Sequence, residues 1–233
     1  MIDRNNIPSC EACFINNEIF RHLTKDEIDV LSYIKSCNTY KKGETIYNEH
    51  NRVSGVFCIS SGIIKHYKTG NDGKEQIIRF SKKNDIFGFR AILSGDSACT
   101  TAKVVEDCTL CFIPVAHFIK MVNENSGFSM SVMKLSCKEL GDANRYILDI
   151  AQKNVKERLA EILLQLNNNF GINEEGYLNI FLTREELAGI VGTATESVIR
   201  LLSEFKKNKL IELNKRKIKI LDIRKLKRLA ELY

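Results

Sequence analysis

The clearest pattern of apolar and polar positions lies between residues 183 and 209. In its second half, apolar side chains recur at spacings of three and four: Val198, Leu201, Leu202 and Phe205. This spacing predicts a helix with one buried face. A shorter amphipathic helix is predicted before it, with Thr183 as its N-cap and a bend at Gly192. Two short helices joined in this way are typical of a helix-turn-helix, whose second helix enters the DNA major groove.

The other face of the second predicted helix carries side chains suited to reading bases. Arginine can donate two hydrogen bonds to guanine, and glutamate can accept one from cytosine. The candidates for base reading are Thr195, Glu196, Ile199 and Arg200. The alternative is an ordinary surface ion pair between Glu196 and Arg200, which are four residues apart and share a helix face.

Basic residues are concentrated at the end of the chain. The whole sequence has a net charge of +6, yet residues 200–233 contain 12 Lys and Arg against 4 Asp and Glu. The runs LIEL, NKRK and IKIL predict a strand, a turn and a strand, as in the wing of a winged helix. A solvated charged face is the alternative, but the neighbouring helix-turn-helix favours contacts with phosphate. The candidates for those contacts are Lys206, Lys215, Arg216 and Lys217.

The first half of the chain has a different pattern. TKDEIDVLSYIK at 24–35 predicts a helix that begins with a capping box of Thr24 and Glu27. From about 39 to 115, short apolar or alternating runs are separated by glycines and an Asn-Asp-Gly turn. Many short strands of this kind predict a small antiparallel barrel or roll.

A long helix is predicted from about 126 to 150. Met133, Leu140 and Ile147 are seven apart, and a second row displaced by three contains Ser136, Ala143 and Ile150. Rows at these spacings form the seam of a coiled coil. A lone helix packed on its own domain would show a similar pattern, but the small side chains favour a dimer. The predicted dimer seam is Met133, Leu140, Ala143 and Ile147.

Composition agrees with a cytoplasmic protein. No segment approaches 18 consecutive apolar residues, and the first residues lack the apolar core of a signal peptide, so we expect no contact with a membrane. The eight cysteines are therefore expected to be mostly reduced thiols rather than a disulfide framework.

The whole chain resembles the Crp/Fnr family of bacterial transcription regulators. The segments that carry the resemblance are KKGETIYNEH, FCISSGIIKHYKTGNDGKEQI, KKNDIFGFRAILSGD, QKNVKERLAEILLQL and LTREELAGIVGTATESVIRLLSEFKKNKLI. The resemblance implies an α+β fold in three parts. These are an antiparallel β-roll at 1–125 (a cupin-like, cyclic-nucleotide-binding-type jelly roll), a dimerisation helix at 126–152 and a winged helix-turn-helix at 153–233.

The same resemblance implies a homodimer that binds double-stranded DNA at an inverted repeat. It implies that an effector or redox signal at the roll sets DNA affinity, and that RNA polymerase is a further partner. It also matches Glu196 and Arg200 to the base-reading residues of the family, and Thr195 and Ile199 to its variable specificity positions.

The effector is not identified by the sequence. In members that bind cyclic nucleotides, a glutamate holds the ribose and an Arg-Ser pair holds the phosphate. Here Ile86 stands at the ribose position, and Cys99 and Thr100 stand at the phosphate position. Arg90 is near in sequence but displaced from the matching position. These departures argue against cyclic AMP, because a buried phosphate needs a cation.

The oxygen-sensing branch of the family binds an iron–sulfur cluster through four cysteines. Cys10, Cys13 and Cys111 match three of them, and Ile19 occupies the place of the remaining one. Cys108 could supply a sulfur, but residues three apart on a strand point to opposite faces. A cluster is therefore a candidate cofactor that we do not favour over a thiol redox pair, with zinc at two CxxC pairs as a further alternative. The other four cysteines are expected in the core: Cys37, Cys58, Cys99 and Cys137.

No catalytic motif is present, and the four histidines are scattered. We therefore expect a regulator and not an enzyme. The alternative function is a thiol- or metal-dependent redox protein that uses Cys10 and Cys13.

Overall fold

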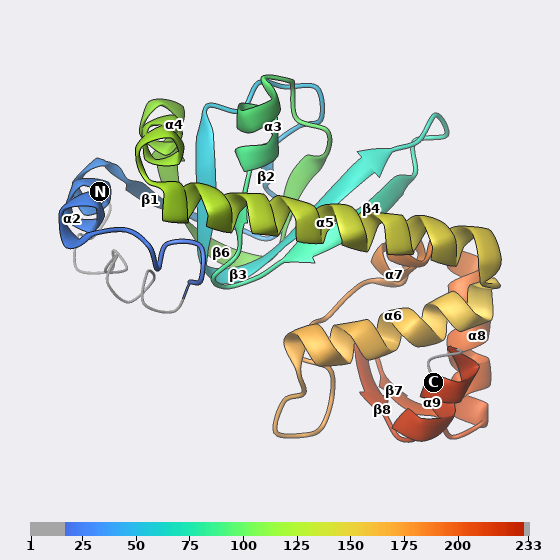
Figure 1. The fold of residues 1–233 in the computed structure, drawn as a ribbon. Coiled ribbons are helices and arrows are strands. Elements are labelled where there is room, and N and C mark those ends of the chain that lie inside the picture. The colour runs from blue at the N-terminus through green and yellow to red at the C-terminus, as the bar shows by residue number, and fades with distance from the viewer. Residues whose placement is uncertain (1–16, 231–233) are drawn as a thin grey trace. The chain divides into compact units, whose positions relative to one another are not determined.

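The computed structural model describes residues 17–230. The chain divides into two compact units, and each is described separately below. Unit 1 comprises Met1–Lys68 and Ile78–Asp142, and unit 2 comprises Thr69–Ile77 and Ala143–Tyr233. The long helix α5 (Ser126–Gln152) contributes residues to both units (Figure 1).

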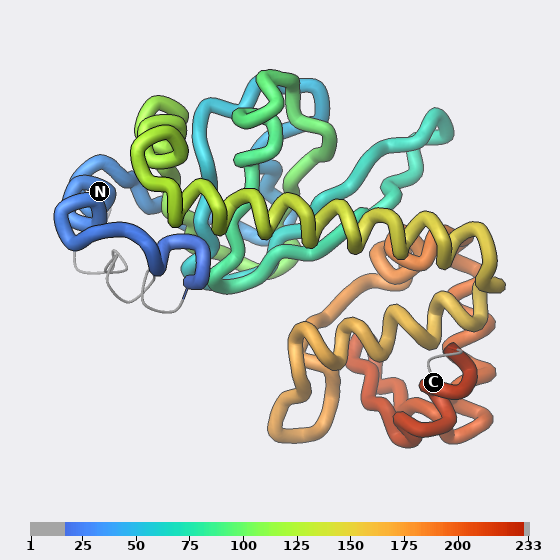
Figure 2. Tube along the Cα trace, in the orientation of Figure 1, coloured from blue at the N-terminus to red at the C-terminus, as the bar shows by residue number. Residues whose placement is uncertain are grey.

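Unit 1 contains an antiparallel sheet with helices on one side (Figures 1 and 2). The strands of this sheet are β1 (Ser36–Tyr40), β2 (Thr45–Tyr47), β3 (Gly55–Thr69), β4 (Glu75–Ser81), β5 (Ile86–Phe87) and β6 (Thr101–Pro114). The end of β3 and the start of β4 belong to unit 2. The main strand order is β1-β6-β3-β4, while β2 pairs with β6 and β5 pairs with β3. The antiparallel roll predicted from alternating short runs is thereby confirmed.

Helices α2 (Lys25–Ile34), α3 (Phe89–Ser94) and α4 (Val115–Glu124) complete unit 1. The predicted capping box of α2 is confirmed, with the Thr24 side chain accepting from the Glu27 amide. The pattern of apolar and polar positions in the sequence did not predict helices α3 and α4. Both are short and lie next to strands, where apolar runs are ambiguous between helix and strand.

Two apolar clusters fill unit 1, one on each face of the sheet. One contains Phe20, Leu31, Phe118 and Phe128 from the helical side together with Ile113 of β6. The other lies inside the roll and contains Ile59, Phe87, Cys108 and Leu110. On β6, Ile113 is an odd number of positions from Cys108 and Leu110 and therefore contributes to the opposite cluster.

Unit 2 contains the predicted winged helix-turn-helix. Its helices are α6 (Val155–Phe170), α7 (Arg184–Val191), α8 (Thr195–Lys207) and α9 (Ile223–Leu229), and its hairpin pairs β7 (Ile211–Asn214) with β8 (Lys217–Ile220). Helix α6 begins at a capping box of Asn154 and Glu157 and buries Leu159, Leu163 and Leu166. Among the described residues, no helix is long and apolar enough to cross a membrane.

Candidate nucleic-acid interface and effector pocket

Helices α7 and α8 have the geometry that the sequence predicts. Thr183 caps α7 by accepting from the Glu186 amide, and the helix ends at Gly192 in the left-handed conformation with φ 71°. That conformation costs a glycine little, so the chain can turn directly into α8. The predicted buried face of α8 is confirmed at Val198, Leu201, Leu202 and Phe205, each at most 4% exposed.

The opposite face of α8 is open to solvent. Glu196, Ile199 and Arg200 are exposed, and Thr195 is half-buried in the first turn. Among the residues that the structure describes, no ion pair joins Glu196 to Arg200. The alternative of an ordinary surface ion pair between them is therefore not supported. The Arg200 side chain is therefore available to a partner outside the chain, whereas the Glu196 carboxylate also interacts electrostatically with Lys74.

Arg158 of α6 fixes the turn between α7 and α8. Its guanidinium donates to the backbone oxygens of Val191 at 2.9 Å and Gly192 at 3.2 Å, and to Lys153 at 2.7 Å. Helix ends leave carbonyl groups without intrahelical partners, and Arg158 satisfies those at the end of α7. Our reading of the sequence missed this residue, because Val191 and Gly192 lie more than 30 positions away along the chain.

The predicted wing is confirmed as the β7–β8 hairpin, whose turn consists of Lys215 and Arg216. Lys215 adopts a positive φ of 53°, and its backbone oxygen accepts from Arg184 at 2.9 Å. Partial burial lowers the pKa of the Arg184 guanidinium. Arg184 thus holds the tip of the wing against the first turn of α7.

The four residues predicted to contact phosphate differ in exposure and in ion pairing. Lys206, Lys215 and Arg216 are exposed. Lys217 is not at the hairpin tip as expected but in strand β8, where its ammonium pairs with Glu175 at 2.8 Å and lies 5.5 Å from the Tyr177 ring centre. Lys217 is therefore the weakest of the four candidates.

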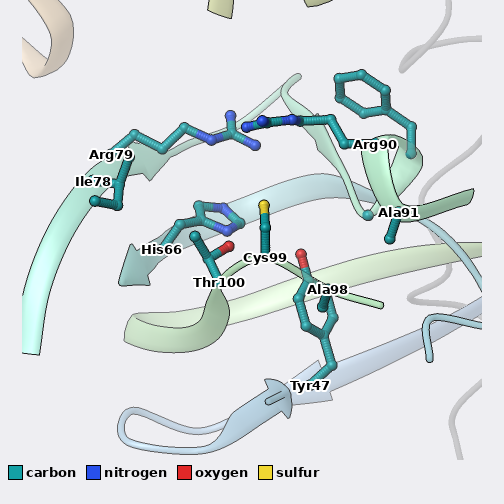
Figure 3. Close-up of a pocket in the computed structure, with 11 residues that line it drawn as sticks. Tyr47, His66, Ile78, Arg79, Arg90, Ala91, Ala98, Cys99 and Thr100 are labelled. Atoms are coloured by element: carbon teal, nitrogen blue, oxygen red, sulfur yellow. The ribbon is translucent and has the colours of Figure 1, made fainter. Parts of the chain in front are cut away.

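Unit 1 holds a small pocket that opens to solvent (Figure 3). Polar side chains from five segments face it: Tyr47, His66, Arg79, Arg90, Cys99 and Thr100. In Figure 3 the guanidinium groups of Arg79 and Arg90 extend toward each other above His66 and Cys99. In the sequence, Arg90 is displaced from the position that matches the phosphate-binding arginine of members that bind cyclic nucleotides. The structure nevertheless brings it to the pocket wall, and it adds Arg79, which our reading of the sequence missed.

The two arginines share one carboxylate. Glu139 of α5 pairs with Arg79 at 3.0 Å and with Arg90 at 3.7 Å, and the Glu139 side chain is only 10% exposed. One negative charge between two positive ones leaves an excess of cation at the pocket. An anion that entered the pocket would therefore compete with Glu139 for the guanidinium groups.

The floor of the pocket is uncharged. His66 is buried, and its Nε2 lies 3.0 Å from the Ser81 hydroxyl. Burial and then the two nearby arginines hold the pKa of His66 well below its ordinary value, so the ring is neutral at pH 7. Burial likewise raises the pKa of Tyr47 to about 12. Ile86, at the position of the ribose-binding glutamate, is buried in β5 and offers no polar group.

The cysteines are placed differently from the expectation. Cys10 and Cys13 lie outside the described residues, so the predicted cluster and the N-terminal redox pair stay predictions. Cys111 is buried on β6, with its Sγ 2.7 Å from the Cys37 Sγ of β1. This hydrogen bond lowers the pKa of the Cys37 thiol.

Cys108 faces the opposite side of the sheet from Cys111, as expected, and packs inside the roll. Burial raises the pKa of its thiol to about 12. Within residues 17–230, no three His, Cys, Asp or Glu side chains are grouped as metal ligands. A site that uses both Cys108 and Cys111 does not fit this arrangement. The expectation that Cys99 and Cys137 lie in the core is wrong, because both are exposed.

Comparisons with known proteins agree with this arrangement. The model of the cyclic nucleotide-binding domain matches residues 37–125, and that of the Crp-like helix-turn-helix domain matches residues 157–229. The chain is 30% identical over 213 residues to Electron transport regulator A of Shewanella oneidensis, covering 89% of this chain and 84% of that one. It is 28% identical over 227 residues to the Fumarate and nitrate reduction regulatory protein of Vibrio cholerae, covering 95% and 90%.

A solved structure of a CRP/FNR-family transcriptional regulator from Thermus thermophilus matches with a TM-score of 0.71 at 25% identity. The match covers 84% of this chain and 98% of that one.

Proposed function

Because the chain belongs to the Crp/Fnr family of transcription regulators, we propose that it binds an inverted-repeat operator as a homodimer. In this proposal, Thr195, Glu196, Ile199 and Arg200 of α8 read bases in the major groove. The observation that carries it is the structure of α8, which has one fully buried face and an opposite face on which Glu196, Ile199 and Arg200 are exposed. Such a helix is fixed in place by its own domain while its polar side chains stay available to base edges.

The cations beside α8 supply the part of the affinity that does not depend on sequence. Lys206 follows the base-reading residues along α8, and Lys215 and Arg216 form the tip of the wing. Contacts from these groups to phosphate set the position of the protein on the duplex without reading sequence. Lys217 contributes less, since Glu175 already neutralises it.

The exposed apolar side chains of α5 support the homodimer. Met133, Leu140 and Ile147 are 55%, 63% and 65% exposed, and Ala143 is also exposed. Three large apolar residues in one row of a helix are costly in water and are buried when two such helices pack together. Two recognition helices related by a twofold axis would read half-sites one helical turn apart, at about 34 Å.

We also propose that the pocket of unit 1 takes an anionic effector that changes DNA affinity. The anion would compete with Glu139 for Arg79 and Arg90, and Glu139 lies on the same helix as the dimer seam. Cyclic AMP stays disfavoured, because Ile86 cannot bind the ribose. RNA polymerase is the partner through which a bound regulator of this family would act on transcription.

The base-reading proposal is tested by Arg200→Ala with Lys206→Ala as its matched control. Arg200→Ala is expected to weaken binding to the preferred operator by about 1–3 kcal/mol and to relax preference at one base pair. Lys206→Ala is expected to weaken all sequences similarly. Fluorescence anisotropy on operators with single base-pair changes separates the two. Identical, sequence-blind effects of both variants would overturn the base-reading assignment.

The dimer is tested by Leu140→Glu with Leu148→Glu as its control. Both residues are exposed leucines of α5, but only Leu140 belongs to the seam. A carboxylate buried in an apolar interface costs several kcal/mol, so Leu140→Glu is expected to sediment as a monomer. The Leu148→Glu variant is expected to remain a dimer. A dimer of unchanged strength in Leu140→Glu would move the interface elsewhere.

A further inference from the structure

We propose that Cys37 and Cys111 form a reversible disulfide and make unit 1 a site of thiol oxidation. The two residues are directly paired across β1 and β6, and their sulfur atoms are 2.7 Å apart. They are 74 positions apart in the sequence, so only the strand pairing brings them together. The N-terminal CxxC motif takes no part in this proposal.

The backbone already has the separation that a disulfide needs. Residues directly opposite each other in an antiparallel pair have Cα atoms about 4.5–5.5 Å apart. Disulfides join Cα atoms about 4.4–6.8 Å apart, so the bond can form without rearranging the two strands. Side chains of such a pair also point to the same face of the sheet, which excludes the usual obstacle of diverging Cβ vectors.

The two thiols differ in their exposure to solvent, and this difference determines which of them reacts first with an oxidant. Cys37 is half-buried on the outer strand, whereas Cys111 is buried in the middle of the sheet. A small oxidant such as hydrogen peroxide therefore meets Cys37 first. The Cys37 thiolate attacks one peroxide oxygen, the O–O bond breaks, and the products are a Cys37 sulfenic acid and hydroxide.

The second step is internal. The Cys111 sulfur attacks the sulfur of the sulfenic acid, the S–O bond breaks, and the leaving hydroxide takes up the Cys111 proton as water. In the net reaction, two thiols are oxidised to one disulfide and one hydrogen peroxide is reduced to two water molecules. A thiol reductant reverses the reaction by disulfide exchange.

A third thiol lies in the same row. Cys58 of β3 is directly opposite Cys111 on its other side, so Cys37, Cys111 and Cys58 follow one another across three strands. Cys58 packs against the apolar cluster that contains Phe128 and Val132 of α5. Oxidation of this row therefore changes packing beneath the start of the helix that carries the predicted dimer seam.

This inference goes beyond the proposed function, since it adds a redox signal in the roll to the anionic effector. Its test reads the state of the thiols and not DNA binding, so the two can fail separately. The full-length protein is reduced, freed of reductant, treated with hydrogen peroxide, alkylated and digested with trypsin. Mass spectrometry is expected to find peptide 36–41 linked to peptide 104–120, and the link is expected to disappear after treatment with dithiothreitol.

The variants make the assignment specific. Cys37→Ser and Cys111→Ser are each expected to abolish the link, whereas Cys108→Ser, on the other face of the same strand, is expected to retain it. Cys99→Ser, which removes an exposed thiol elsewhere, is expected to retain it as well. Recovery of Cys37 and Cys111 as alkylated thiols, while Cys99 is oxidised, would overturn the proposal. A link from Cys37 to any cysteine other than Cys111 in the unmodified sequence would overturn it too.

Discussion

Cations in the two units are held in opposite ways. On the winged helix, Arg200, Lys206 and Lys215 are exposed and form no ion pair among the described residues. In the pocket of unit 1, Arg79 and Arg90 instead converge on the largely buried Glu139. Unpaired surface cations are ready to meet phosphate, whereas the paired arginines can bind an anion only by giving up a carboxylate. The comparison suggests that unit 2 is preorganised for its ligand, while unit 1 must exchange one partner for another.

Removing the shared carboxylate should test this difference most severely. Glu139→Gln leaves two guanidinium groups facing each other without a counter-charge, and we expect it to destabilise unit 1 by about 2–3 kcal/mol. The same change in unit 2, Glu196→Gln, is expected to alter stability by no more than about 0.5 kcal/mol. Urea unfolding followed by circular dichroism measures both. Equal effects would mean that Glu139 is no more essential to its unit than a surface residue.

Replacing Arg158 should have an intermediate effect, because it tests what preorganises the free cations. Arg158→Lys loses the fork that reaches the oxygens of Val191 and Gly192, at an expected cost of about 1–2 kcal/mol. Arg200→Lys, on the exposed face of α8, is expected to leave thermal stability unchanged. If Arg158→Lys unfolds at the same temperature as the unmodified protein, Arg158 does not hold the turn.

Removing one cation of the wing should have the smallest effect. Lys215→Ala is expected to lower the slope of log affinity against log salt by about one unit, because one phosphate contact is lost. Lys217→Ala should change this slope less, since Glu175 already neutralises Lys217. Binding to a fixed operator over a range of salt concentrations provides the comparison. A larger change in slope for Lys217→Ala would show that Lys217 turns toward DNA when bound.

The helix-turn-helix and the wing of unit 2 could be predicted from the sequence. The spacing of Val198, Leu201 and Phe205 depends on the helical period alone, and Gly192 marks the bend that only a permissive residue adopts easily. The wing was predictable for the same reason, since a short turn between two alternating runs is a local pattern. The position of Lys217, which is the first residue of β8, was misjudged, and Arg158 was missed.

The pocket and the thiol row could not be predicted because they depend on contacts between distant segments. Arg79 comes from β4 and Glu139 from α5, and nothing local relates them. Cys37 meets Cys111 through strand register, which a sequence specifies only after the strand order is known. Exposure of Cys99 was missed for a related reason, since an isolated cysteine carries no periodic signal.

Selection of binding sites from random DNA by the full-length protein tests the central proposal most directly. A homodimer that inserts α8 into successive major grooves should recover an inverted repeat, with half-site centres about 10–10.5 base pairs apart. The Arg200→Ala variant should recover the same spacing with one base pair of each half-site relaxed. Recovery of a single asymmetric site, or of no preferred sequence at low salt, would contradict the account.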